Sequence, residues 1–120
     1  MQISPENDVT AYIIYIGIND KNTHEQIIDT AVFERIIKNV CKGYSVAFST
    51  HLQQGGYLHE NGVYTQENSA VLTLIGASRE DVNAVAADLC CFFNQESVLV
   101  EVRKSACYSV SETIAIDDLR

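Results

Sequence analysis

The sequence is poor in positive charge and in residues that favour disorder. Eight lysines and arginines stand against sixteen aspartates and glutamates, which gives a formal net charge of −8 over 120 residues. Nucleic acids and anionic membranes need a basic surface, and the basic residues form no cluster, so we expect neither as a partner. A single proline and a hydrophobic fraction of 47% argue against extended disorder.

Long apolar runs and a secretion signal are also missing. No run approaches the roughly 20 apolar residues of a membrane-spanning helix, and residues 1–8 have neither the basic start nor the apolar centre of a signal peptide. We therefore expect a cytoplasmic protein. Cys41, Cys90, Cys91 and Cys107 lack C-x-x-C spacing, and three of them lie in apolar stretches, which is typical of reduced core thiols.

Two strand patterns enclose the least ordinary part of the sequence. Residues 44–50 alternate between large and small or polar side chains, as a strand with one buried face does. Residues 70–75 are almost wholly apolar, which is typical of a central strand. Between them, Asn61-Gly62 is a strong turn signal, because both central positions of a type I′ turn need positive φ. We expect a long hairpin with a functional tip.

Helical periodicity appears on either side of this hairpin. Apolar residues recur at helical spacing after Asp29 and again after Ser78, and both residues are suited to be N-caps. Residues 9–18 and 98–102 are rich in β-branched residues and predict two further strands.

The resulting order predicts an α+β, ferredoxin-like βαββαβ two-layer sandwich. Its antiparallel four-stranded sheet would carry two helices on one face and a long hairpin between the second and third strands. We expect one domain over residues 1–120, with a core at about 9–103 and a tail or edge strand at 104–120. Because two central strands are apolar on both faces, we also expect a homodimer through the open sheet face.

The histidines of the hairpin raise the question of a metal. His51, His59 and Glu60 lie between the two strand patterns, with His24 farther away in the sequence. Their spacing matches no standard metal site. We therefore expect neither a metal nor a cofactor.

Gly55 and Gly56 interrupt a strand-forming stretch just before Tyr57. Adjacent glycines in such a place mark either a β-bulge that bends the hairpin or a close approach of a ligand to the backbone. The sequence leaves both interpretations open.

Several short motifs resemble those of an uncharacterised bacterial family of small domains of unknown function. They are Gly55-Gly56-Tyr57, Asn61-Gly62, Glu67 with Ser69, Phe93-Asn94-Gln95-Glu96-Ser97-Val98-Leu99, and Ala106-Cys107. The family typically has tryptophan where Tyr57 stands and glycine where Asn94 stands. The resemblance implies one continuous domain and singles out Tyr57, Glu67, Gln95 and Glu96, but it brings no established activity.

Two functions from different classes fit this sequence. The first is an oligomeric binding module without catalysis, whose hairpin contacts a small ligand or a protein partner, in a shape similar to that of the signal-transducing PII proteins. Its expected binding residues are Gly55, Gly56, Tyr57, His59, Glu67, Gln95 and Glu96. The second is a small cofactor-independent enzyme of the dimeric ferredoxin-like barrel type. Its pocket, between sheet and helices, would be lined by Tyr12, Tyr15, Tyr57 and His51. We favour the first, because no catalytic constellation is visible and no residue is assigned to catalysis.

Overall fold

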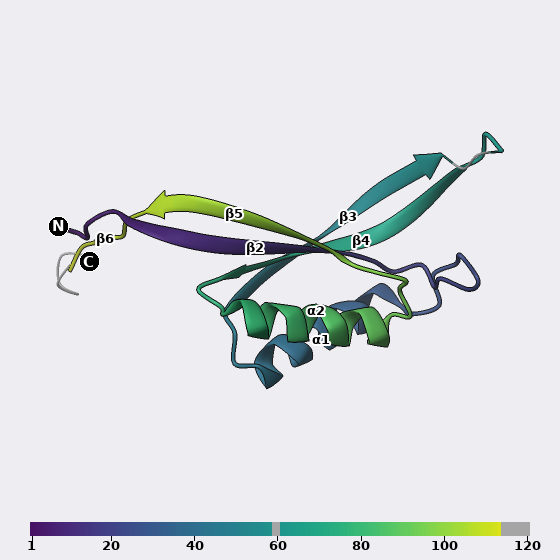
Figure 1. Ribbon diagram of the computed structural model, residues 1–120, viewed down its shortest axis with the longest axis horizontal. Helices are drawn as coiled ribbons and strands as arrows, with labels where there is room; N and C mark the ends of the chain where they lie inside the picture. The colour runs from purple at the N-terminus through teal and green to yellow at the C-terminus, as the bar shows by residue number, and fades with distance from the viewer. Residues whose placement is uncertain (59–60, 114–120) are drawn as a thin grey trace, which may run out of the picture.

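The computed structural model describes residues 1–58 and 61–113 as a four-stranded sheet with two helices on one face (Figure 1). The sheet is antiparallel, in the order β3-β4-β2-β5. The elements are β1 (Gln2–Ile3), β2 (Asn7–Gly17), α1 (Thr30–Gly43), β3 (Phe48–Leu58), β4 (Tyr64–Ile75), α2 (Arg79–Phe92), β5 (Leu99–Cys107) and β6 (Val110–Ser111). The α+β class, the four-stranded antiparallel sheet and the two helices are therefore confirmed.

The complete element order differs from the expected βαββαβ at both ends of the chain. β1 and β6 pair with each other in a second, two-stranded sheet, which the polar residues at either end did not indicate. None of the helices in the described part of the chain is long and apolar enough to cross a membrane.

The sheet extends beyond the helices as two arms that point in opposite directions (Figure 1). β2 and β5 form one arm, and β3 and β4 form the other. The Cα radius of gyration is 18.5 Å, with extents of 62 × 34 × 30 Å, whereas a compact chain of this length has a radius of gyration of roughly 14 Å. Much of each arm therefore lies outside the two-layer core.

The core fills the space between the sheet and the helices. The rings of Phe33 on α1 and Phe93 after α2 meet edge to face with centroids 4.3 Å apart. Asp29 and Ser78 cap the two helices as expected, by accepting the backbone N–H groups of Ala31 and Asp81. The other fully buried residues include Ile14, Ile16, Ile18, Ile37, Leu72, Leu74, Val82, Val85 and Leu89.

The opposite face of the sheet has no helix over it, but it is only partly open. Ile13 and Val71 lie outside the main core cluster, yet only 4% and 8% of their surfaces are exposed. Ile75 and Leu99, nearer the edges, are 55% and 67% exposed. The apolar patch expected on this face is therefore smaller than the sequence predicts, because its central side chains are already covered.

The hairpin is longer and more regular than its sequence suggests. β3 and β4 pair without interruption from Phe48↔Leu74 to Leu58↔Tyr64, so the bulge considered at Gly55 and Gly56 is absent from this ladder. A turn follows at Asn61-Gly62, and Gly62 has the positive φ (+83°) that the sequence predicts for it. The side-chain oxygen of Asn61 accepts the N–H of Val63 at 3.0 Å.

Candidate functional site

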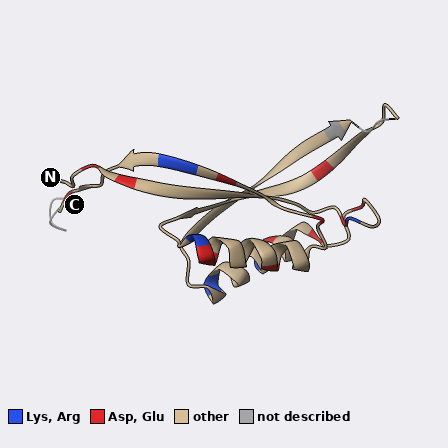
Figure 2. Cartoon of the chain, viewed as in Figure 1, with Lys and Arg blue, Asp and Glu red and all other residues tan. Residues whose placement is uncertain are grey.

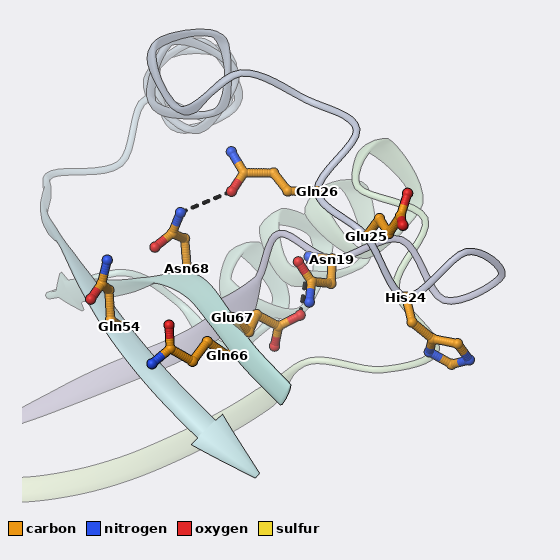
Figure 3. A pocket seen from close by; sticks show the side chains of 8 residues that line it. All are labelled: Asn19, His24, Glu25, Gln26, Gln54, Gln66, Glu67 and Asn68. Atoms are coloured by element: carbon orange, nitrogen blue, oxygen red, sulfur yellow. Dashed lines mark hydrogen bonds between the residues drawn. The ribbon is translucent and has the colours of Figure 1, made fainter. Parts of the chain in front are cut away.

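A polar cleft lies where the β3–β4 arm leaves the two-layer core (Figure 3). One wall comes from the facing segments of β3 and β4, and the other from the loop between β2 and α1. The cleft has a volume of about 360 Å³. Its lining residues are Asn19, His24, Glu25, Gln26, Gln54, Gln66, Glu67 and Asn68.

The carboxylate of Glu67 is held in this cleft by the end of β2 and the residues after it. Its Oε2 accepts the backbone N–H of Asn19 at 3.0 Å, and its carboxylate lies directly against Gly17, where a Cβ would come within 2.6 Å of Cδ. Gly55 is paired with Glu67 on β3, but a Cβ at Gly55 would meet nothing within 4 Å. The carboxylate is therefore held by the backbone donor of Asn19 and by its packing on Gly17.

The turn after α2 anchors the loop that forms the other wall. Gln95 Nε2 donates to the carbonyl of Asn19 at 2.6 Å, and Asn94 Nδ2 donates to Asp20 Oδ2 at 2.7 Å. The bond from Asn94, together with the backbone N–H of Asn22, holds the pKa of Asp20 below its usual value. One chain of contacts thus runs from Gln95 through Asn19 to Glu67.

An amide pair spans the cleft. Asn68 Nδ2 donates to Gln26 Oε1 at 2.9 Å, and Figure 3 shows the two side chains pointing toward each other. Gln26 Nε2 is held in turn by the carbonyl of Ile28 and the hydroxyl of Thr30, at 2.9 and 3.1 Å. This bridge connects the loop before α1 to β4.

Two other side-chain amides beside the cleft, those of Gln54 and Gln66, are in a position to bind a ligand. Within the described part of the chain, no hydrogen bond engages the side chains of Gln54 and Gln66. Figure 3 shows both beside the cleft. Because each amide has donors and an acceptor, they suit a ligand with both kinds of group.

The cleft is lined by two acidic side chains and one histidine, His24. Glu25 and Glu67 are its charged residues, and no Lys or Arg is among the described residues that line it. The chain has no Lys or Arg between positions 43 and 78, so neither residue type lies on the β3–β4 arm (Figure 2). This environment favours a cationic or neutral polar ligand over a phosphate.

The structure brings together part of the set of binding residues that the sequence predicts. Glu67 lies in the cleft, Gly55 is paired with it, and Gly56 is paired with Gln66. Gln95 stands behind the cleft and supports Asn19. Glu96 is exposed and does not line the cleft, so the structure does not group it with the others.

Tyr57 and His59 are the remaining binding residues that the sequence predicts. Tyr57 is in β3, opposite Thr65. His59, with its neighbour Glu60, lies outside the described residues. Among residues 1–58 and 61–113, no three His, Cys, Asp or Glu side chains lie close enough to share a metal ion.

The pocket expected for the alternative enzyme is not assembled from its predicted residues. Tyr12 packs against the core on the helix side. Tyr15 and His51 alternate to the other face, where the hydroxyl of Tyr15 donates to Glu101 at 2.5 Å. The prediction is wrong because it assigned one face to side chains that the pleat directs to both.

Sequence reasoning missed the amides of the cleft: Asn19, Gln26, Gln54, Gln66 and Asn68. The signal that could have found some of them is a cluster of glutamines in a stretch with strand character. Such residues neither pack a core nor favour a turn, and they gather on one arm of this sheet.

Comparison with known proteins shows the fold and one closer likeness. No family model matches the chain, and no curated protein matches it; the resemblance to a bacterial family of unknown function is therefore not confirmed. A phage SAM lyase in complex with S-methyl-5′-thioadenosine is 25% identical with a TM-score of 0.60, over 89% of this chain and 93% of the lyase. CutA from Synechococcus elongatus is 11% identical with a TM-score of 0.56, over 90% of this chain and 85% of CutA. The GlnK–ATP complex of B. subtilis is also 11% identical, with a TM-score of 0.54 over 82% of each chain. These neighbours place the chain among small ferredoxin-like α+β folds.

Proposed function

We propose that this protein binds S-adenosylmethionine in the polar cleft and cleaves it to S-methyl-5′-thioadenosine. The observation that carries the proposal is a cleft lined by a fixed carboxylate, Glu67, and several amides, with no Lys or Arg among its described residues. The likeness to the phage lyase, over nearly the full length of both chains, supports the same ligand. The protein would then be a small cofactor-independent enzyme.

The similar structures contain two different adenosine compounds, S-methyl-5′-thioadenosine and ATP. The charge of the cleft favours the first type of ligand over the second. S-adenosylmethionine carries a sulfonium and an ammonium group, and a carboxylate in a partly desolvated cleft attracts both. The triphosphate of ATP, which the GlnK complex contains, is recognised by Lys, Arg or backbone N–H groups. Glu25 and Glu67 would repel it here.

A lyase needs no water and no redox partner for this cleavage. In one route the carboxylate of the substrate attacks its own γ carbon, the C–S bond breaks, and its electron pair passes to sulfur. Neutral S-methyl-5′-thioadenosine leaves, and the four-carbon fragment closes to a lactone. In the other route a base removes the β proton and the fragment leaves as an unsaturated amino acid. The first route asks the protein only to orient the substrate.

Calorimetric titration with S-adenosylmethionine and with ATP tests the proposed ligand. We expect the sulfonium compound to bind at least tenfold more tightly than ATP. Glu67→Gln keeps an oxygen that can accept the Asn19 N–H and removes the negative charge. This change should lower the affinity for S-adenosylmethionine at least tenfold. Glu6→Gln, an exposed carboxylate at the far end of β2, is the matched control. Tighter binding of ATP would overturn the proposal.

A binding module without catalysis is the second candidate. It is favoured by the lining of the cleft, whose described residues include no Ser, Thr, Cys or Lys nucleophile. This reading predicts that S-adenosylmethionine binds and is recovered unchanged.

We also propose that two copies associate through the open sheet face. The exposed Ile75 and Leu99 and the large radius of gyration support it, since a second copy would cover apolar surface that one chain leaves in water. Size-exclusion chromatography with light scattering should give twice the 13.3 kDa of one chain. Leu99→Glu should shift that mass to the monomer, and a wild-type monomer at micromolar concentration would contradict the proposal.

Domain organisation and location remain proposals as well. We expect residues 1–120 to form one domain, so that limited proteolysis leaves a fragment that retains both helices and the sheet. We expect the protein in the cytoplasmic fraction of its host. Cleavage between α1 and β3 into two stable halves would contradict the first.

A further inference from the structure

A second cavity adjoins the polar cleft on the side of α1. Its volume is about 280 Å³, and it shares Gln54 and Asn68 with the cleft. Thr30, Leu52 and Gln53 complete its lining, which has one apolar side chain, Leu52, and no charged residue. The two cavities are therefore neighbours that differ in charge, because the acidic residues line only the cleft and Leu52 lines only the second cavity.

Leu52 is an apolar side chain that the helices leave uncovered. It is paired on β4 with Ala70, which is fully buried in the core, and directly paired residues point to the same face of a sheet. Leu52 therefore belongs to the helix-facing side, yet 39% of its surface is exposed. A partly exposed apolar side chain therefore lies in the cavity that Thr30, the first residue of α1, also lines.

We propose that this second cavity is the subsite for the adenine ring of the ligand, with the charged portion held at Glu67. The inference rests on the proposed function and adds which part of the molecule each compartment takes. A purine has two apolar faces and a hydrogen-bonding edge, which is what Leu52 and the amides around it complement.

The amides at the boundary can exchange partners when the ring enters. Gln26 and Asn68 bond to each other at 2.9 Å, and the amide of Gln54 makes no bond with a described residue. Asn and Gln amides match the donor and acceptor on the edge of adenine. A bound base thus replaces one amide contact by another, so few polar groups are left unpaired.

The distance between the two parts of the proposed site also fits. Leu52 is three residues from Gly55, the partner of Glu67, which is about 10 Å along a strand and comparable with the length of an adenosine unit. Because this separation is odd, Leu52 and Glu67 leave the hairpin on opposite faces. The ligand therefore passes from the second cavity into the cleft at Gln54 and Asn68, which line both.

Uncharged probes isolate the adenine subsite from the charge of Glu67. Calorimetric titration with adenosine and with S-methyl-5′-thioadenosine should show binding to the wild type. Leu52→Ala should weaken both at least fivefold, whereas Leu52→Met, which keeps an apolar side chain of similar volume, should stay within twofold. Leu58→Ala is the control on the same strand, since Leu58 is exposed and lies outside both linings. Thermal unfolding of each variant checks that it is folded.

The outcomes separate this inference from the proposed function. No adenosine binding by the wild type, or equal effects of the Leu52 and Leu58 changes, overturns the subsite. If the protein releases S-methyl-5′-thioadenosine but its affinity for adenosine does not change in Leu52→Ala, the proposed activity is supported and the subsite is rejected. Adenosine binding that depends on Leu52 without any cleavage supports the subsite and rejects the lyase.

Discussion

The carboxylate of Glu67 lies against the α carbon of Gly17 on the neighbouring strand, so closely that any side chain at position 17 would overlap it. The same carboxylate accepts the N–H of Asn19, two residues farther along the chain. The end of β2 therefore both makes room for the acid and holds it. This contact places the one firmly held carboxylate of the cleft.

Gly17→Ala should displace Glu67 and impair ligand binding. The added methyl group would lie 2.6 Å from Cδ of Glu67, so the carboxylate must move and give up the Asn19 contact. We expect affinity for S-adenosylmethionine to fall at least tenfold by calorimetry. Gly43→Ala, where a Cβ meets nothing within 4 Å, should leave affinity unchanged. Equal affinities of the two variants would contradict the role assigned to Gly17.

The core depends on the aromatic pair at the end of α2. Phe33 is fully buried against Phe93, so Phe33→Ala should lower the free energy of unfolding by about 3–5 kcal/mol. Val32→Ala on the same helix, where 38% of the side chain is exposed, should cost less than about 1 kcal/mol, since a half-exposed site leaves no cavity. Urea unfolding of both variants measures the difference.

The buried and the exposed cysteines should react with thiol reagents at different rates. Burial raises the pKa of Cys41 to about 11, so its thiol should stay unreactive in the folded protein at pH 8. Cys91 and Cys107 are exposed and should react first with a chromogenic disulfide reagent. The double change of both to Ser should remove the fast phase, and a fast reaction of Cys41 would contradict the described packing.

The loss of folding stability at acid pH should depend on Glu101. Hydrogen bonds from Arg103 and then from Tyr15 hold the pKa of Glu101 below its ordinary 4.5. A lowered folded-state pKa contributes stability above pH 4.5 that disappears as the pH falls through the folded-state value. The melting temperature of wild type should therefore fall more steeply below pH 4.5 than that of Glu101→Gln. Parallel curves would show that the network contributes nothing; Glu6→Gln is the control.

The sequence predicts the helices, their caps and the central strands because these elements bury regular apolar stripes. Asp29 and Ser78 cap the helices as expected. It fails for β3 beyond Thr50, where Gln53, Gln54 and two glycines form a strand that is exposed on the arm and has no alternation to detect. It also fails for β1 and β6, whose pairing joins residues more than 100 positions apart.

The candidate site was predictable only where a residue stood out by type. Glu67 and Gln95 could be singled out from the motifs, but their connection runs through the backbone of Asn19, which no side-chain pattern reveals. Asn94 has φ of +46°, a left-handed conformation that Gly and Asn adopt most readily. The amides of the cleft come from three separate segments, and only the fold brings them together.

Incubation of the purified protein with S-adenosylmethionine, followed by chromatography and mass spectrometry, tests the central claim most directly. We expect S-methyl-5′-thioadenosine to accumulate together with a four-carbon lactone or unsaturated amino acid. Glu67→Gln should reduce the rate at least tenfold, and Glu6→Gln should match the wild type. Unchanged S-adenosylmethionine, or equal rates with and without the Glu67 carboxylate, would contradict the account.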